Sequence, residues 1–515
     1  MHSLFRSVVI ILGFCWVRID GTSSPPSIYP VDEHIFNAVV DHFSFRPTTN
    51  AYLPLRYYVN EKHWNGTGPC FFYAGNEADI FQFVNNSGFL FESAEEFGAM
   101  VVFAEHRYYG ESFPTWDDMS FLTVEQAMAD FNTLNVHIRR KWEMPRETAF
   151  VAFGGSYGAN LAMWLRLKNP NLWAGAIASS ATPLKHILRE TNDFAAIETE
   201  AYGNISSKCP ELVRDGWKDL FDSVATKEGR KSVSKALGLC HALPDSGFAT
   251  DIYGWISGAL ETMVQYGYPY PTEFYNPVPA YPFKVACEEM LTAATGFGAL
   301  RAAVDVYYNY TGQAGECFHN EDILVEAAKH WNRKGDHHRL YEQEQRIQRR
   351  LGKHRIHIEP RFTIQSGSSD AWGYQTCTEV YQPMPTNGIT DFLIPHTPDK
   401  AAYFRRCRKT WGVEPRPNWE EMHFMGDSIG AGSNIFLSSG QLDPWRAAGI
   451  QKTPYGAPDS IIVRIIEHGA HHLDLRASNP LDPPSVVAVR QEEKIAMQQW
   501  IKEWREIYGG AKKPR

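Results

Sequence analysis

A serine between glycines is the strongest chemical signal in this sequence of 515 residues. Residues 154–158 read Gly-Gly-Ser-Tyr-Gly, with an apolar strand-like run directly before them and a helical pattern after them. This strand–turn–helix arrangement is typical of a nucleophile elbow, a turn so tight that it raises the serine hydroxyl above the edge of a sheet. A structural glycine-rich turn is the alternative, but the flanking pattern favours Ser156 as a nucleophile.

A serine nucleophile needs a histidine base and an acid that orients it, and after an elbow they follow in the order Ser, Asp, His. Asp443 comes shortly after an apolar run at 434–437, where the carboxyl end of a strand would face a ligand. Another run at 461–466 leads into His468, His471 and His472. Spacing alone does not choose between these histidines. A zinc site made by all three is a competing interpretation, which the elbow disfavours.

The acyl-transfer intermediate also needs backbone N–H donors for its oxyanion. The amide of Tyr157, directly after the nucleophile, is one expected donor. The loop after an apolar run at 71–74 reads Gly-Asn-Glu, so Gly75 and Asn76 are candidates for the second donor. Gly75 could instead serve only to permit a turn.

The elements that would position these residues alternate along the chain. Helical patterns separate apolar β-type runs, which predict a mostly parallel sheet covered by helices. These runs are 71–74, 100–104, 149–153, 173–178, 434–437 and 461–466. A capping box of Thr123 and Gln126 begins one helix, and a last amphipathic helix is expected at about 485–508. Residues 185–430 lack strand-like runs and predict an inserted, mostly helical cap.

The first residues indicate export from the cytosol. Arg6 precedes an apolar run at 8–17 that is too short to cross a bilayer, and small residues follow. This pattern predicts a signal peptide over residues 1–22 and no membrane span after its cleavage. Four Asn-x-Ser/Thr sequons agree with passage through the secretory pathway: Asn65, Asn85, Asn204 and Asn309.

Composition narrows the range of partners. The net charge of −9 at pH 7 argues against nucleic acid. Of eight cysteines, Cys15 lies in the expected signal peptide, which leaves an odd number and at least one free thiol in an oxidising compartment. Cys70, beside an apolar run, is the candidate for this thiol. There is no Cys-x-x-Cys pair, and we expect neither a metal nor a cofactor.

Four motifs together resemble the lysosomal prolyl serine peptidase family, which includes Pro-X carboxypeptidase, dipeptidyl peptidase II and a thymus-specific serine protease. They are Phe-Ala-Glu-His-Arg-Tyr-Tyr-Gly-Glu-Ser at 103–112, Gly-Gly-Ser-Tyr-Gly at 154–158, Leu-Asp-Pro-Trp at 442–445 and Gly-Ala-His-His-Leu-Asp-Leu-Arg at 469–476. The resemblance implies an α/β-hydrolase fold in two parts, 35–184 and 431–510, around a helical cap region at 185–430. It also implies His471 as the base, which completes a triad with Ser156 and Asp443.

The same resemblance leaves Cys70 free and implies three disulfides: Cys209–Cys287, Cys240–Cys317 and Cys377–Cys407. The sequence departs from the family where Ala78 and Ala159 replace glycines, and where Arg-Ala-Ala-Gly at 446–449 replaces the glycine-rich stretch that follows the Asp-Pro-Trp motif in the family. A charged excursion at 334–361 is longer than expected. Because the triad is unchanged, these departures bear on substrate preference more than on activity.

The resemblance implies a serine exopeptidase that cuts small peptides after proline, in the lysosome, in another acidic vesicle or outside the cell. Glu77 could hold the free amine of a substrate, and Trp445 could line the proline subsite. Similarity at 268–273 and 473–480 favours release of dipeptides, as by dipeptidyl peptidase II, with Pro-X carboxypeptidase as the alternative. A lipase or esterase would share the elbow, whereas a non-catalytic binding protein would be expected to have a broken triad. The chain could act alone or as a homodimer.

Overall fold

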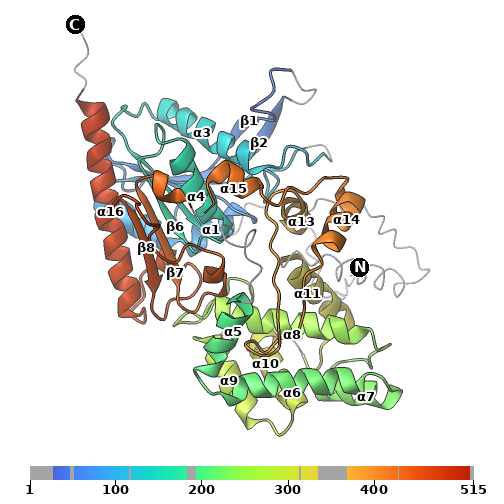
Figure 1. The fold of residues 1–515 in the computed structure, drawn as a ribbon. Helices are drawn as coiled ribbons and strands as arrows, with labels where there is room; N and C mark the ends of the chain where they lie inside the picture. Colours follow the sequence, from blue (N-terminus) through green and yellow to red (C-terminus); the bar gives the residue numbers. More distant parts are fainter. Residues whose placement is uncertain are drawn as a thin grey trace, which may run out of the picture.

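The computed structural model describes residues 27–46, 51–114, 118–182, 193–312, 315–333, 368–426 and 428–510. The expected signal peptide and the charged excursion at 334–361 lie outside these residues. The described chain forms one sheet of eight strands (Figure 1). The strands are β1 (Asp32–Val39), β2 (Tyr52–Asn60), β3 (Cys70–Ala74), β4 (Met100–Ala104), β5 (Phe150–Gly155), β6 (Gly175–Ser179), β7 (Ile435–Gly440) and β8 (Ile461–Ile466).

The strand order is β1-β2-β4-β3-β5-β6-β7-β8. β2 is antiparallel to both of its neighbours, and from β4 to β8 every pairing is parallel. This order, with a nucleophile elbow after β5, is the α/β-hydrolase arrangement, so the predicted fold class is confirmed. The six predicted runs correspond to β3–β8. Their residues form continuous apolar stretches because helices cover both faces of a parallel sheet.

Two sets of helices cover the sheet. One apolar core packs α3 (Val124–Lys141) and α4 (Tyr157–Lys168) against one face. A second core packs α1 (Ile80–Asn86), α2 (Gly88–Phe97) and α16 (Pro484–Gly509) against the other. Figure 1 shows α16 and α4 on opposite sides of the sheet. Among the described residues, no helix combines the length and the apolar character needed to cross a bilayer.

The start of α3 corrects one detail of the sequence prediction. Thr123 caps the helix, because its Oγ1 accepts a hydrogen bond of 3.2 Å from the amide of Gln126. In a capping box, the Gln126 side chain would also accept a hydrogen bond from the backbone amide of Thr123, and it does not do so here. It instead donates to Asp41 and accepts from the amide of His42, and so ties the segment after β1 to the helix.

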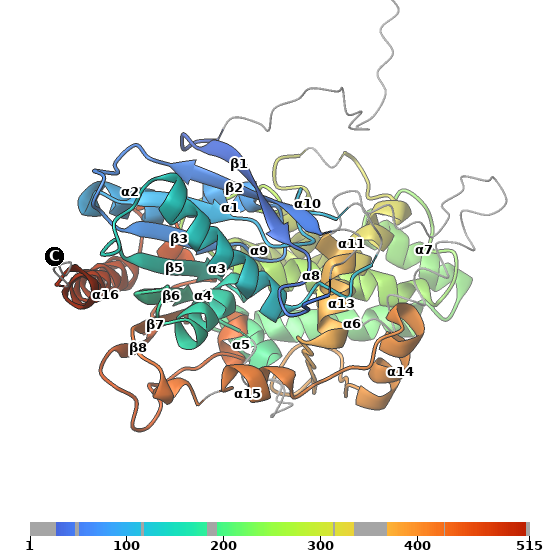
Figure 2. The same cartoon turned by 90° about the horizontal axis from the view of Figure 1, so that it is seen from above.

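Between β6 and β7 the described chain is helical, as the sequence predicted, and Figure 2 shows these helices gathered beyond one end of the sheet. The helices between residues 193 and 333 share an apolar core of their own, whereas Trp372, Val380 and Phe424 belong to the core on one face of the sheet. The helices of the inserted region are α5 (Asp193–Gly203), α6 (Lys208–Ser223), α7 (Lys227–Ala236), α8 (Phe248–Gln265), α9 (Pro282–Thr292), α10 (Gly296–Tyr308), α11 (Asn320–Arg333), α13 (Ser368–Thr378), α14 (Lys400–Trp411) and α15 (Trp419–Phe424). Short 3-10 turns follow in the hydrolase part: η1 (Ile429–Ala431), η2 (Pro444–Ala447) and η3 (Leu473–Leu475).

Disulfides staple the inserted region, in the three pairings that the family resemblance implied. Cys209–Cys287 joins α6 to α9, Cys377–Cys407 joins α13 to α14, and Cys240–Cys317 closes a third loop. Cys70 is free and buried, and burial keeps its thiol protonated, so it is unreactive. Of the four sequon asparagines, Asn65 and Asn204 are exposed and Asn85 and Asn309 are partly exposed; their glycosylation stays a prediction.

Candidate active site

Ser156 occupies the turn between β5 and α4. Its backbone has φ +58° and ψ −127°, a strained conformation for a residue with a side chain. The turn leaves no room beside it: a Cβ on Gly154 would lie 2.0 Å from the carbonyl oxygen of Gly158, and one on Gly158 would lie 2.7 Å from that of Ala74. The glycines are therefore needed for close backbone approach, and the partly exposed serine stands at the N-terminus of α4.

Asp443 and His471 meet at the carboxyl ends of the neighbouring strands. Asp443 Oδ2 lies 2.8 Å from His471 Nδ1, and both side chains are buried. Asp443 Oδ1 accepts a second hydrogen bond, from the amide of Trp445, which fixes the carboxylate. Because the carboxylate is an acceptor, Nδ1 of His471 carries the hydrogen and Nε2 keeps its lone pair. Nε2 is buried and has no hydrogen-bond partner among the described residues, so it is available to a reacting proton.

The inserted region holds the backbone of His471 in place. The amide of His471 donates to the carbonyl of Gln265, at the end of α8, over 2.9 Å. The hydroxyl of Tyr268 donates to the carbonyl of His471, also over 2.9 Å. Cap residues thus fix the base from one side while Asp443 orients its ring from the other.

The other two histidines have different surroundings. His468 is exposed, and its ring lies 3.6 Å from Glu467. His472 is buried beside the elbow, where a Cβ on Gly155 would lie 3.2 Å from its ring. Burial, reinforced by the charges of His471 and Arg476, lowers the pKa of His472 well below its usual value, so its ring is neutral. Within the part of the chain that the structure describes, no three His, Cys, Asp or Glu side chains are grouped to hold a metal.

The structure excludes one of the predicted oxyanion donors, the amide of Gly75. The amide of Gly75 donates to the carbonyl of Ala104 over 2.9 Å, so it cannot bind an oxyanion. Gly75 serves the tight turn instead, because a Cβ there would lie 2.3 Å from the same carbonyl oxygen. Asn76 is buried and borders the elbow, 3.2 Å from the place of a Cβ on Gly158. Asn76 and the amide of Tyr157 remain the candidate donors.

A buried hydrogen-bond network lies behind the elbow, and no sequence pattern predicted it. The Tyr157 hydroxyl lies 3.1 Å from Gln375 Nε2, which donates to it, and 3.2 Å from the ring of His106. The hydroxyl of Tyr109 donates to the other amide atom of Gln375. Gln375 lies on α13, 218 positions from Tyr157, so no local pattern points to this contact. Through it, the inserted region holds Tyr157, whose amide is a candidate oxyanion donor.

The sequence profile of the family described as Serine carboxypeptidase S28 matches residues 38–493 of this chain. The chain belongs to this family. Lysosomal Pro-X carboxypeptidase of Bos taurus is 36% identical over 480 residues, which are 90% of this chain and 87% of that protein. Thymus-specific serine protease of Homo sapiens is 24% identical over 473 residues, 87% of this chain and 82% of that protein. The resemblance seen in the motifs is confirmed, and the protein is a serine-type peptidase.

Similarity to solved structures is weaker. An acetylester hydrolase from Corynebacterium glutamicum is 11% identical, with a TM-score of 0.35 over 91% of this chain and 96% of that one. A similarity at this level does not identify a fold. The fold of the S28 peptidase is assigned from its strand order and its nucleophile elbow.

An apolar cluster lies directly beside Asp443, the candidate acid of this S28 peptidase. Trp445, two residues after Asp443, packs edge-on against Phe194 of α5 with ring centres 4.9 Å apart. The Nε1 of Trp445 is buried and has no partner among the described residues. An apolar wall with one free N–H donor suits the ring and carbonyl of a prolyl residue. The cluster consists of Phe194, Ile197, Met384, Trp445 and Ala447.

Two charged residues border this region. Glu77 has a buried Oε2 without a donor among the described residues, and burial raises the pKa of its carboxyl although His471 and Asn76 act in the opposite direction. Glu77 therefore lies near the base. Arg446, in the stretch that departs from the family, donates to the carbonyl of Gln441 and lies 3.9 Å from Glu200 of α5. It thus links the acid's loop to the cap.

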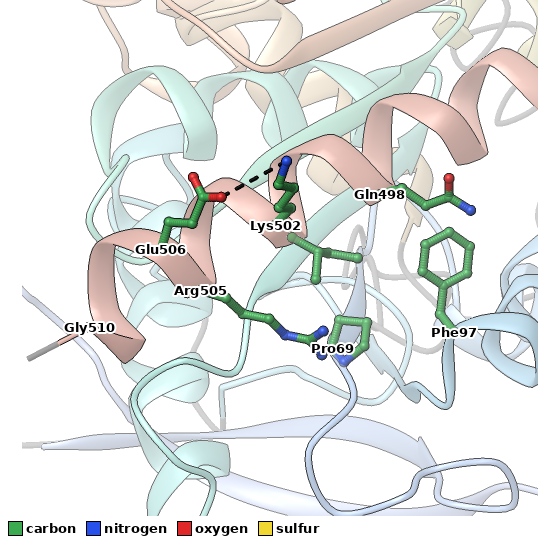
Figure 3. Close-up of a pocket in the computed structure, with 8 residues that line it drawn as sticks. Pro69, Phe97, Gln498, Lys502, Arg505, Glu506 and Gly510 are labelled. Carbon is green, nitrogen blue, oxygen red and sulfur yellow. Dashed lines mark ion pairs between the residues drawn. The ribbon is translucent and has the colours of Figure 1, made fainter.

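A groove lies away from the candidate triad. It has a volume of about 570 Å³ and lies between α16 and the amino end of β3 (Figure 3), whereas Ser156, Asp443 and His471 follow the carboxyl ends of their strands. Figure 3 shows Lys502 paired with Glu506 along its wall, 4.0 Å apart. Its lining residues are Pro69, Phe97, Gln498, Ile501, Lys502, Arg505, Glu506 and Gly510.

Proposed function

We propose that this peptidase is a Pro-X carboxypeptidase that releases the last residue of a peptide from a preceding proline, in a lysosome or another acidic compartment. The observation that carries the proposal is the apolar Trp445 cluster beside an oriented Asp443–His471 pair. Its similarity to proteins named lysosomal Pro-X carboxypeptidase supports the same choice. The triad of Ser156, Asp443 and His471 is part of the proposal.

The proposed reaction gives each of these residues a role. Nε2 of His471 takes the Ser156 hydroxyl proton as the oxygen attacks the prolyl carbonyl carbon. The amide of Tyr157 and the Asn76 region stabilise the oxyanion, a contribution of about 3–4 kcal/mol per donor in related chemistry. The His471 imidazolium, stabilised by Asp443, then protonates the leaving amine of the last residue. Water, activated by the same base, cleaves the acyl-enzyme and restores the serine.

The properties of Glu77 favour a carboxypeptidase over a dipeptidyl peptidase. Dipeptide release requires an ionised acid to hold the free ammonium group of the substrate, which is the role that the sequence suggested for Glu77. Burial raises the pKa of Glu77, which favours its protonated form over the ionised form that an ammonium group would need, and a protonated carboxyl can donate a hydrogen bond to a carboxylate. A positive charge also lies close to the histidine loop. The Arg476 guanidinium lowers the pKa of His472, and it lies 4.9 Å from the centre of the Tyr268 ring.

Paired peptides distinguish the two exopeptidase activities. With acetyl-Ala-Pro-Phe, whose amine is blocked, we expect release of free phenylalanine. With Ala-Pro-Phe amide, whose carboxyl end is blocked, we expect no cleavage. Mass analysis of the products checks both. Release of Ala-Pro from the amide would contradict the proposal in favour of a dipeptidyl peptidase, and cleavage of short acyl esters alone would favour a lipase or esterase.

Substitution of Glu77 tests its role in binding the substrate carboxylate. Glu77→Gln supplies an N–H donor in place of the carboxyl O–H and removes the ionisable group, so at acidic pH we expect kcat/KM for acetyl-Ala-Pro-Phe to change by less than about tenfold. As the pH rises, Glu77 in the wild type ionises and repels the carboxylate, so its KM increases. The KM of the Gln variant should lack this increase. A pH series of KM for both proteins is the measurement, and identical profiles would exclude Glu77 from the carboxylate subsite.

A further inference from the structure

Two buried carboxyl groups face each other behind the loop that carries His471. Asp474 belongs to η3, three residues after His471, and Glu493 belongs to α16. Their exposed fractions are 1% and 0%. A pair of buried acids is costly unless hydrogen bonds or a shared proton compensate it.

Asp474 connects the histidine loop to the strands that carry the rest of the site. One of its carboxyl oxygens accepts a hydrogen bond of 2.5 Å from the hydroxyl of Ser179, the last residue of β6. The other accepts from the hydroxyl of Ser438 on β7, the strand that leads to Asp443. The carbonyl of Ser179 also accepts from the amide of Ser156 over 3.0 Å. The Asp474 carboxylate therefore fixes the base relative to both the nucleophile and the acid.

Glu493 faces this carboxylate without a donor of its own. Its carboxyl lies within hydrogen-bonding range of Asp474, yet neither of its oxygens has a donor among the described residues. Arg490, one turn earlier on α16, does not neutralise it. That guanidinium donates to the backbone carbonyls of Leu473 and Asp474 and pairs with Asp482 over 2.6 Å. Two ionised carboxylates in this position would repel each other. One proton on either carboxyl would remove this repulsion and provide a hydrogen bond between them.

We propose that Glu493 is a positioning residue: its protonated carboxyl donates to Asp474, and this proton-sharing pair holds the His471 loop in its catalytic position. Of the two acids, Glu493 carries the proton because both carboxyl oxygens of Asp474 already accept hydroxyl hydrogen bonds, whereas neither oxygen of Glu493 has a donor among the described residues.

The electrostatic surroundings of Glu493 agree with this assignment, and they determine whether the pair stabilises the fold at low or at high pH. Burial, followed by the charge of Asp474, raises the pKa of Glu493 well above its usual value; Glu492 adds to this and Arg490 opposes it. An acid whose pKa is higher in the folded than in the unfolded chain binds its proton more tightly when folded. It therefore stabilises the fold at low pH and loses this effect as the pH rises from its unfolded value towards its folded one. The pair suits an enzyme that works in an acidic compartment.

The test compares Glu493→Gln with Glu492→Gln. Both variants remove one carboxyl from α16, but Glu492 is partly exposed and pairs with Arg464 on β8, away from Asp474. A glutamine at 493 supplies an N–H donor to Asp474 at every pH. Tm and the rate of fluorophosphonate labelling are measured from about pH 5 to about pH 8, a range set by ordinary acid and histidine titrations. Neither measurement needs a peptide substrate, although the labelling arm rests on the proposed triad.

For the wild type and Glu492→Gln, we expect Tm and labelling rate to decrease together as the pH rises and Glu493 loses its proton. For Glu493→Gln, we expect wild-type labelling at acidic pH within about threefold and a smaller decrease of both quantities as the pH rises. Equal pH slopes in all three proteins would overturn the proposal. If Glu493→Gln does not fold, Asp474→Asn takes its place, because its amide donates to an ionised Glu493; an unchanged slope there would have the same meaning. If the protein were not a Pro-X carboxypeptidase, only the assay with paired peptides would give a different result, and the pH series of Tm and labelling would be unaffected.

Discussion

Ser156→Ala is expected to lower kcat/KM for acetyl-Ala-Pro-Phe by roughly 10⁴-fold or more, because members of a catalytic triad act as a unit. The fold should be unaffected: the serine side chain makes no hydrogen bond within the described residues, and alanine has the same backbone preference at φ +58°. The measurement is steady-state kinetics together with Tm. Retention of a tenth of the activity in a folded variant would exclude Ser156 as the nucleophile.

His471→Ala is expected to cause a loss of similar size, since it removes the only group positioned to take the serine proton in this proposal. Asp443 is 2.8 Å from Nδ1 of this ring and leaves its Nε2 ready to accept a proton. Within the described part of the chain His472 has no such acid partner, and its ring fills space beside Gly155. His472→Ala should therefore keep a measurable share of activity.

The exposed His468 supplies the matched control for this comparison. It lies in the same loop, and its exposed ring lies 3.6 Å from the exposed Glu467, so His468→Ala should change kcat/KM by less than about twofold. Kinetics of the three variants against one peptide give the ranking directly. A dead His472→Ala and an active His471→Ala would reverse the assignment of the base.

The sequence predicted those parts of the fold whose signals are local. The elbow is a five-residue pattern with a strand before it and a helix after it, and β3–β8 are continuous apolar runs because they are buried on both faces. β1 and β2 were not predicted. β1 is an edge strand whose exposed face includes Ile35 and Val39 and whose remaining residues are mixed, so it lacks a continuous run.

Contacts between distant segments could not be read from the sequence. Nothing near Gly75 shows that its amide is already bonded to Ala104 on the neighbouring strand, and the oxyanion prediction was wrong there for this reason. The contact of Gln375 with Tyr157 and the facing carboxyls of Asp474 and Glu493 likewise depend on how the cap and α16 pack. The disulfide pairings were available only through the family resemblance, because spacing does not determine connectivity.

Labelling with a fluorophosphonate, followed by peptide mapping, tests the central claim most directly. The probe reacts with a serine only when a base and an oxyanion site activate it, so it reports the nucleophile without assuming a substrate. We expect one modified residue, Ser156, in the wild type, no label in Ser156→Ala, and strongly slowed labelling in His471→Ala. A label on another residue, or labelling of Ser156→Ala at the wild-type rate, would contradict the proposed triad.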